Sequence, residues 1–205
     1  MEKVQRKVRE FQMRRAVILS AAEKIFSVSG FHQVTVAQIA AASGFSTGFL
    51  YQFFDGKEHL YTAMISEKLD LMYAVIDAEV KAVKNTENKI AALIGAHLRF
   101  VQDHKDFCRI FLRGASDALS GVMTEVRRKV MDDYLRQLSL IENILKDGVK
   151  KGVIRTLPTQ EMAGALIHLI RAASAHWLML PSDEPLVSQK DFIMDVFLHG
   201  VMKHA

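Results

Sequence analysis

The sequence predicts an all-α protein of about nine helices, with a small N-terminal helical domain and a larger C-terminal one. Apolar residues recur at three- and four-residue steps along most of the 205 residues. No segment alternates apolar and polar residues over the length of a strand. Half of the residues are hydrophobic and only three are prolines, which favours a folded helical core.

The first helix is predicted from about Phe11 to Ser29, because apolar residues form one face up to Gly30, which is a stop signal. A second, short helix begins at Thr35. Thr35 and Gln38 have the spacing of a capping box, in which each side chain binds a free backbone N–H of the first turn. Gly44 ends this helix.

A third, short helix follows the tight turn, with Ser46 as its N-cap. Asp55 and Glu58 have the spacing of another capping box and predict a long fourth helix, from about Gly56 to about Lys84. Two short helices joined by a tight turn, over about residues 35–54, indicate a helix-turn-helix.

The remaining sequence predicts five further helices. They span about Thr86–Gln102, His104–Ala118, Val122–Lys150, Thr159–Leu180 and Ser188–Lys203. In the long helix 122–150, an apolar stripe that includes Tyr134 and Leu138 is expected to face the core, and Asp132 and Asp133 to be solvated. We place the domain boundary after residue 60, which gives domains of residues 1–60 and 61–205.

Composition indicates the cellular compartment in which we expect the protein. The single cysteine, Cys108, forms no internal disulfide, and we expect it to be a buried apolar residue. Neither a signal peptide nor a membrane span is indicated, so we expect a soluble, cytoplasmic protein without membrane contact.

Residues 1–60 hold eight Lys/Arg against five Asp/Glu, within a formal charge of +4 for the chain. The positive excess therefore lies with the helix-turn-helix, as attraction to DNA phosphates requires.

A run of residues around the helix-turn-helix carries a family resemblance. It comprises Ile25-Phe26 with Gly30-Phe31, Thr35-Val36 with Ile39-Ala40, Ala42 with Gly44, Ser46 with Gly48 and Leu50-Tyr51, and Phe54 with Lys57 and Leu60. This run resembles the DNA-binding domain of the tetracycline-repressor (TetR) family. Beyond the first third of the chain, only length, helicity and helix order match. The resemblance implies a homodimeric repressor that binds a near-palindromic DNA operator and is released by a small, largely apolar ligand.

The start of a recognition helix faces base edges, which predicts base contacts by Thr47, Gly48 and Gln52. Thr47 offers a hydroxyl or a methyl group, Gln52 an amide for adenine, and Gly48 a close backbone approach. The apolar residues of the same helix are expected to be core rather than wedges between bases. These are Phe49, Leu50, Phe53 and Phe54.

Six residues are candidates for phosphate contact. Three stand at helix starts, where free N–H groups and the helix dipole favour an anion. One matches the family's phosphate-binding tyrosine, and two belong to the basic N-terminal segment. The set is Thr35, Ser46, Lys57, Tyr51, Arg14 and Arg15. Two alternatives stay open: Thr35 and Ser46 act only as caps, and the basic residues are merely solvated.

The last two predicted helices are apolar or small on more than one side, which predicts a homodimer interface built as a four-helix bundle. In the alternative, they only close their own core. The candidate interface residues are Leu166, Ile170, Ala173, Trp177, Phe192, Ile193, Val196, Phe197 and Gly200.

The resemblance also implies an effector site in the C-terminal domain. Aromatic, methionine and orienting polar residues are candidates for its lining, although each is equally a core or surface residue. They are His97, Phe100, His104, Phe107, Phe111, Met123, Tyr134, Arg171 and Trp177.

Two other function classes are alternatives. One is a DNA-binding regulator without a small-molecule effector, whose C-terminal domain serves dimerisation or protein partners. The other is an enzyme, for which we find neither a nucleophile pattern, nor zinc-ligand spacing, nor a Gly-rich phosphate loop. We therefore expect no catalytic site, cofactor or metal.

Overall fold

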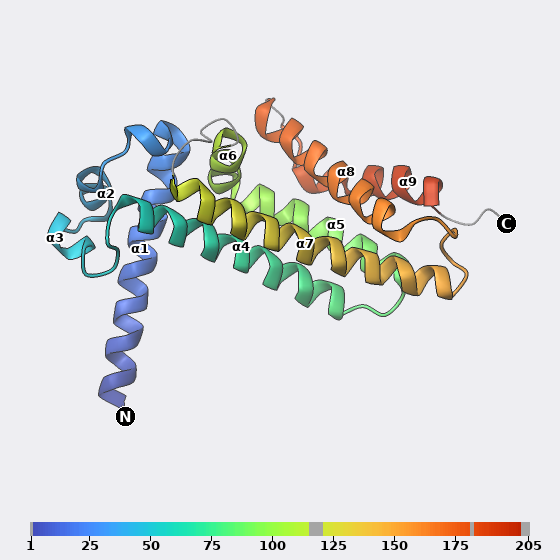
Figure 1. Cartoon of the computed structure of the whole chain (residues 1–205), viewed down its shortest axis with the longest axis horizontal. Helices are drawn as coiled ribbons and strands as arrows, with labels where there is room; N and C mark the ends of the chain where they lie inside the picture. Colours follow the sequence, from blue (N-terminus) through green and yellow to red (C-terminus); the bar gives the residue numbers. More distant parts are fainter. Residues whose placement is uncertain (1, 115–120, 181–182, 202–205) are drawn as a thin grey trace. The chain divides into compact units, whose positions relative to one another are not determined.

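The computed structural model describes residues 2–114, 121–180 and 183–201, without the side chains of residues 2–3, 111–114, 121–123 and 200–201. Within these residues the chain forms nine α-helices, one 3₁₀ helix and no β-strand (Figure 1), which confirms the all-α prediction. The predicted ligand-lining residues Phe111 and Met123 and the predicted interface residue Gly200 lie outside the part of the chain whose packing the structure describes.

The helices follow the predicted order. They are α1 (Glu2–Gln33), α2 (Val36–Ser43), α3 (Thr47–Leu50), α4 (Lys57–Lys81), α5 (Thr86–Asp103), α6 (Lys105–Gly114), α7 (Gly121–Lys150), α8 (Thr159–Met179), the 3₁₀ helix η1 (Leu186–Gln189) and α9 (Lys190–Val201). The predicted last helix thus begins as a 3₁₀ turn.

The chain divides into two compact units. Unit 1 comprises residues Met1–Lys68 and Asp106–Arg127, and unit 2 comprises Leu69–Lys105 and Arg128–Ala205. Helices α4 and α7 therefore contribute residues to both units. The predicted boundary after residue 60 stays a prediction.

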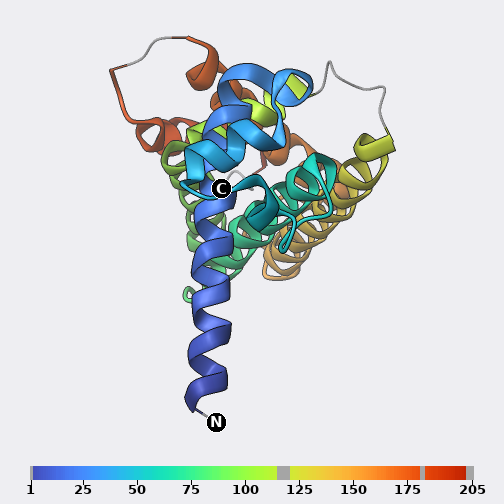
Figure 2. The ribbon, with the colours of Figure 1, turned by 90° about the vertical axis from the view of Figure 1, so that its left-hand side faces the viewer.

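Helix α1 begins nine residues earlier than predicted. It starts at Glu2, and the backbone leaves helical geometry at Gly30, with φ 72°. The sequence before Phe11 has no apolar face for a core, and Val4 and Val8 are 66% and 56% exposed. Arg6 and Glu10 form an ion pair one turn apart, which supports a solvated helix. Figure 2 shows this N-terminal part of α1 extending away from α2 and α3.

Local capping sets the ends of α2. The Thr35 hydroxyl accepts from the Gln38 backbone N–H at 3.3 Å, and the Thr35 N–H donates to Gln38 Oε1 at 2.8 Å, which confirms the capping box. Gly44 adopts the left-handed conformation at φ 75°, and its N–H closes the last turn. The short turn between α2 and α3 follows from these caps.

Gly44 provides a test of this turn. Replacing Gly44 by Ala is expected to lower the free energy of unfolding by about 1–2 kcal/mol, because a Cβ is disfavoured in the left-handed region. An added Cβ meets no atom within 4 Å, so backbone strain alone is measured. Gly48→Ala is the matched control: Gly48 is helical with equally open space, and the change should be neutral or stabilising. Chemical denaturation of the two variants checks this, and equal stability would contradict the assignment.

The predicted capping box at Asp55 and Glu58 is wrong. Helix α4 starts at Lys57, so Gly56 is the residue directly before it. The Asp55 N–H donates to His59 Nδ1 at 3.2 Å, and its carboxylate lies 3.3 Å from the same nitrogen. Asp55 therefore binds the side chain one turn on rather than the free N–H groups of α4.

In unit 2, α5 packs against α8 and α9. Its core face includes Ile90, Leu93, Ile94 and Leu98, each at most 1% exposed. Among the described residues, no helix is both long and apolar enough to cross a membrane.

The core face of α7 differs from the prediction. Tyr134 and Leu138 are only half-buried, whereas Asp133 and Gln137 are 2% and 1% exposed. The expectation that Asp133 is solvated is therefore wrong, because an ammonium group of the same helix pairs with it. Asp132 is exposed, as expected.

Candidate DNA-binding surface and effector site

Helix α3 presents one exposed polar face. Thr47, Gly48, Tyr51 and Gln52 are all exposed, and Tyr51 is 54% exposed. They occupy positions i, i+1, i+4 and i+5, which lie on one side of a helix. Although α3 as such ends at Leu50, turn hydrogen bonds continue to Phe54, so Tyr51 and Gln52 keep helical placement. Unit 1 therefore presents the three predicted base-contacting residues together with Tyr51.

The opposite side of α3 is held in the core of unit 1. Leu50 and Phe54 are 1% and 3% exposed. The half-buried Phe49 and Phe53 belong to an aromatic row: the Phe53 ring centroid lies 4.4 Å from Phe11 on α1 and 5.2 Å from Phe49. These contacts attach α3 to α1 and fix the direction of its exposed face.

Both predicted caps are in place at the helix starts. Ser46 Oγ accepts from the Phe49 N–H at 3.2 Å, and Thr35 closes the capping box of α2. Both residues are exposed, so the remaining N–H groups of these first turns are open to an anion. Capping and phosphate binding are thus compatible at Thr35 and Ser46.

The Lys57 ammonium has partners inside unit 1. It donates to the backbone oxygens of Phe31 at 2.9 Å and His32 at 3.4 Å, and lies 4.5 Å from the centroid of the Phe31 ring. It thereby satisfies carbonyls at the end of α1, where the helix dipole favours a cation. To contact a phosphate, the Lys57 ammonium must first release these two backbone oxygens.

The two arginines of α1 differ in their surroundings. Arg14 is exposed, with its guanidinium 5.8 Å from the centroid of the Phe49 ring. Arg15 is paired with Glu67 of α4 and lies 5.2 Å from the centroid of the Phe54 ring. Arg14 therefore has the freer charge for a phosphate, and Arg15 mainly connects α1 to α4.

The predicted effector residues occupy different places. In unit 2, His97 and Phe100 are buried on α5, and His104 caps this helix with its ring centroid 4.4 Å from that of Phe100. Phe107 is buried on α6 and belongs to unit 1.

Three further predicted residues lie on α7 and α8. Tyr134 is half-buried, and the exposed Arg171 has its guanidinium 4.9 Å from the centroid of its ring. Trp177 is half-buried and donates from Nε1 to the Glu184 backbone oxygen at 2.9 Å. The arginine and the two aromatic rings thus lie nearer the surface of unit 2 than His97 does.

His97 is held neutral by its surroundings. It is 7% exposed, and Gln137 Nε2 lies 3.1 Å from its Nδ1. Burial, with a smaller contribution from Arg171, lowers the pKa of His97 to about 4. At neutral pH the imidazole is therefore uncharged, and it accepts the Gln137 amide hydrogen at Nδ1.

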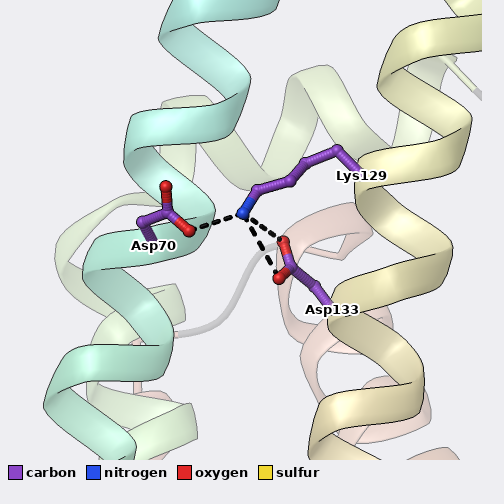
Figure 3. Close-up of polar contacts among 3 residues, drawn as sticks. All are labelled: Asp70, Lys129 and Asp133. Atoms are coloured by element: carbon purple, nitrogen blue, oxygen red, sulfur yellow. Dashed lines mark hydrogen bonds and ion pairs between the residues drawn. The ribbon is translucent and has the colours of Figure 1, made fainter.

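Sequence reasoning missed a charged cluster between α4 and α7. The Lys129 ammonium lies between the Asp70 and Asp133 carboxylates (Figure 3). It donates to Asp70 Oδ1 and, at 3.4 Å, to Asp133 Oδ1, and lies 3.3 Å from Asp133 Oδ2 without hydrogen-bond alignment. The four-residue spacing of Lys129 and Asp133 was a visible signal, but their pairing with α4 was not.

Two other site types are not indicated. Among the described residues, no group of three or more His, Cys, Asp or Glu side chains is arranged to hold a metal ion. Burial raises the pKa of the Cys108 thiol to about 12, so it stays protonated and weakly nucleophilic at neutral pH.

The predicted dimer residues separate into inner and outer sets. Leu166, Ile170, Ile193 and Phe197 are at most 4% exposed within the single chain, because α5, α8 and α9 pack together. Ala173 and Trp177 are half-buried. Phe192 and Val196 are 68% and 43% exposed on the other side of α9. A second chain therefore has access to these two residues.

Family models match both parts of the chain. Residues 18–64 match the model described as "Bacterial regulatory proteins, tetR family". Residues 65–200 match that of the "YsiA-like protein, C-terminal region". Together they span most of the sequence, and the first includes the whole helix-turn-helix.

Two individual proteins that the chain resembles are also named as regulators. The fatty acid metabolism regulator protein of Bacillus subtilis is 22% identical over 90% of this chain and 93% of its own. The HTH-type transcriptional regulator RutR of Escherichia coli O157:H7 is 30% identical over 82% of this chain and 76% of its own.

A solved structure shares the fold. The structure of FadR from Bacillus subtilis in complex with stearoyl-CoA has a TM-score of 0.78 at 19% identity, and covers 90% of this chain and 98% of that one. The chain therefore belongs to the tetR family of bacterial regulatory proteins and is a DNA-binding transcriptional regulator.

Proposed function

We propose that the protein is a homodimeric repressor, active in the cytoplasm, that binds a near-palindromic operator and is released by a small, largely apolar ligand. The observation that carries this proposal is the exposed face of α3, where Thr47, Gly48, Tyr51 and Gln52 stand together over a buried support. A face of this kind at the start of a recognition helix suits the major groove.

Residues of this face have separate tasks in the proposal. Gln52 donates to and accepts from an adenine edge, Thr47 contacts a neighbouring base, and Gly48 lets the backbone come close. Phosphates bind at the start of α2, beside Thr35, and at the start of α3, beside Ser46. The Tyr51 hydroxyl and the Arg14 guanidinium complete these phosphate contacts.

Dimerisation sets the spacing of the two recognition helices. We assign the interface to the outer face of α9, where Phe192 and Val196 are exposed, together with the neighbouring groove of about 380 Å³ beside α8. Burial of such apolar surface is the main source of stability in obligate dimers. On an operator, the two α3 helices then enter successive major grooves about 34–36 Å apart.

The effector is assigned to unit 2. The names of two relatives, a fatty acid metabolism regulator and a regulator solved with stearoyl-CoA, support a ligand with a long apolar chain. Such a ligand releases DNA only through unequal affinity for the bound and free arrangements of the protein. Helix α4, which has residues in both units, is the element through which we expect it to act.

Phosphate contacts provide the test of DNA binding. The affinity of the protein for a duplex from the region upstream of its own gene is measured by fluorescence anisotropy at several salt concentrations. Arg14→Gln is expected to reduce the slope of log affinity against log salt by about one per protomer, because one cation less displaces counterions. Tyr51→Phe should weaken binding at an unchanged slope, since a hydroxyl carries no charge.

Lys84→Gln, at an exposed position between α4 and α5, is the matched control and should bind as the wild type does. An unchanged slope for Arg14→Gln, or unchanged affinity for Tyr51→Phe, would contradict the assignment. A long-chain acyl-CoA added to the complex should dissociate it. An acyl-CoA that binds tightly without changing operator affinity would exclude that compound as the effector.

A further inference from the structure

Helix α7 carries polar groups on its core face. Lys129, Asp133 and Gln137 follow at four-residue steps and therefore lie along one side of the helix. The same row of four-residue steps continues in the buried apolar residues Ile141 and Leu145, both 0% exposed. We name the three polar residues the α7 polar stripe. The two buried members, Asp133 and Gln137, conflict with apolar core packing, and such conflicts concentrate at functional sites.

Two oxygens of the α7 polar stripe are buried without a hydrogen bond. They are Gln137 Oε1 and Asp133 Oδ2. Asp133 Oδ2 has the ion pair with Lys129, whereas Gln137 Oε1 has no hydrogen-bond partner among the residues that the structure describes. Leaving a buried acceptor unpaired costs about 1–3 kcal/mol, so most buried polar atoms have a partner in the working state.

The groups around Gln137 Oε1 and Asp133 Oδ2 indicate whether the missing partner is a hydrogen-bond donor or an acceptor. His97 is neutral and its Nδ1 faces the Gln137 amide nitrogen, which leaves the amide oxygen as the free atom. Asp133 is a second acceptor one turn away. Tyr73 of α4 is 8% exposed, and its pKa is raised to about 12 by burial and by the charge of Asp133, so its hydroxyl keeps its proton. Two acceptors side by side require donors.

The charges near the α7 polar stripe disfavour a buried anion beside Gln137 and Asp133. Asp133, 2% exposed, shares a single ammonium with Asp70. Two other cations whose charges act on Tyr73, Arg136 and Arg171, are at exposed positions. The Arg136 guanidinium lies 5.9 Å from the centroid of the Tyr73 ring, and the Arg171 guanidinium lies 4.9 Å from that of Tyr134. A carboxylate or phosphate beside Gln137 would therefore face Asp133 without a buried cation of its own.

We infer that Gln137 and Asp133 form a binding site for an N–H or O–H donor at the polar end of the effector, such as an amine, a hydroxyl or the amide N–H of an acyl-CoA. The inference rests on the proposed ligand-responsive function and adds the chemistry of recognition. The apolar body of the ligand packs among the helices of unit 2, and its donor pairs with Gln137 Oε1 and Asp133 Oδ2. A free carboxylate in the same position is rejected.

Three probes with the same number of carbon atoms test the inference on the full-length protein: decanol, decylamine and decanoate. Binding is followed by calorimetry and by the fluorescence of Trp177, the only tryptophan. Decanol and decylamine are expected to bind at least about tenfold more tightly than decanoate, which corresponds to one hydrogen bond gained or refused. Gln137→Met and Asp133→Asn should each reduce this preference, because each removes one of the two groups that favour a donor over a carboxylate.

Asp132→Asn is the matched control, because it removes the same charge at the adjacent, exposed position. It should bind all three probes as the wild type does. If Gln137→Met does not fold, Gln137→Asn keeps the amide but withdraws its oxygen, and it should weaken decanol and decylamine alone.

The inference is overturned if decanoate binds as tightly as decanol, if both variants keep the wild-type preference, or if neither donor probe binds. A preference for decanoate would mean that the Gln137 amide nitrogen faces the ligand. This result would also overturn the inference. Operator affinity is measured on the same samples without probe. If the wild type does not bind the operator, the proposed function is refuted. If it binds the operator but does not discriminate among the three probes, only the inference is refuted.

Discussion

Replacing Lys129 by Met is expected to lower the free energy of unfolding by about 3 kcal/mol, toward the lower end of the range for breaking a buried ion pair. The carboxylate of Asp133 is 2% exposed, and Lys129 is the cation that contacts it. Without the ammonium, a buried charge stays unpaired and the contact from Asp70 on α4 to α7 is lost. Since whole domains unfold at about 5–15 kcal/mol, this is a large fraction of the total.

Combining Lys129→Met with Asp133→Leu is the informative comparison. The double variant removes both charges and replaces them with apolar groups, so it should recover most of the lost stability. Urea denaturation at pH 7 compares the wild type, the single variant and the double variant. The protomer concentration is kept fixed, because dimerisation links stability to concentration. A single variant within about 1 kcal/mol of the wild type would show that the pair contributes as little as a surface salt bridge.

Acidification from pH 7 to pH 4 is expected to cost the native state about 3 kcal/mol through His97 alone. Burial lowers its folded pKa to about 4, from 6.5 in the unfolded chain. Between these values the unfolded chain binds the proton and the folded chain does not. The contribution of His97 to stability is therefore fully present above pH 6.5 and disappears as the pH falls toward 4.

The replacement His97→Gln isolates this contribution, because it has no charge to gain at either pH. Carboxylates whose pKa is lowered by lysine partners, such as Glu142 beside Lys146, titrate in both proteins and cancel in the comparison. The variant should therefore lose about 3 kcal/mol less than the wild type between pH 7 and pH 4 in chemical denaturation. His168→Gln, at an exposed histidine of α8, is the control. Parallel pH profiles for wild type and His97→Gln would refute the neutral, buried state.

Local signals made the helix-turn-helix predictable. The caps at Thr35 and Ser46 and the turn at Gly44 each depend on residues within four positions, so the sequence contains all the partners. The alternation of exposed and buried residues in α3 follows from helical spacing. The fold class and the exposed face of α3 could therefore be predicted.

Partners far away in the sequence could not be predicted. The Lys57 ammonium binds a carbonyl 26 residues earlier, and Lys129 binds a carboxylate 59 residues earlier. Helical spacing alone placed Asp133 in solvent, because nothing within α7 shows that α4 brings Asp70 to the same ammonium. Likewise, the buried pairing of His97 with Gln137 joins residues 40 positions apart.

Sequence-specific binding through α3 is tested most directly by comparing two duplexes, one with the operator and one with the same bases scrambled, for the wild type and Gln52→Ala. The wild type is expected to prefer the operator by at least about 10³-fold. Gln52→Ala should reduce operator affinity by about 1–3 kcal/mol per base contact and leave the affinity for scrambled DNA unchanged. Equal wild-type affinity for both duplexes, or equal weakening of both by Gln52→Ala, would contradict the account.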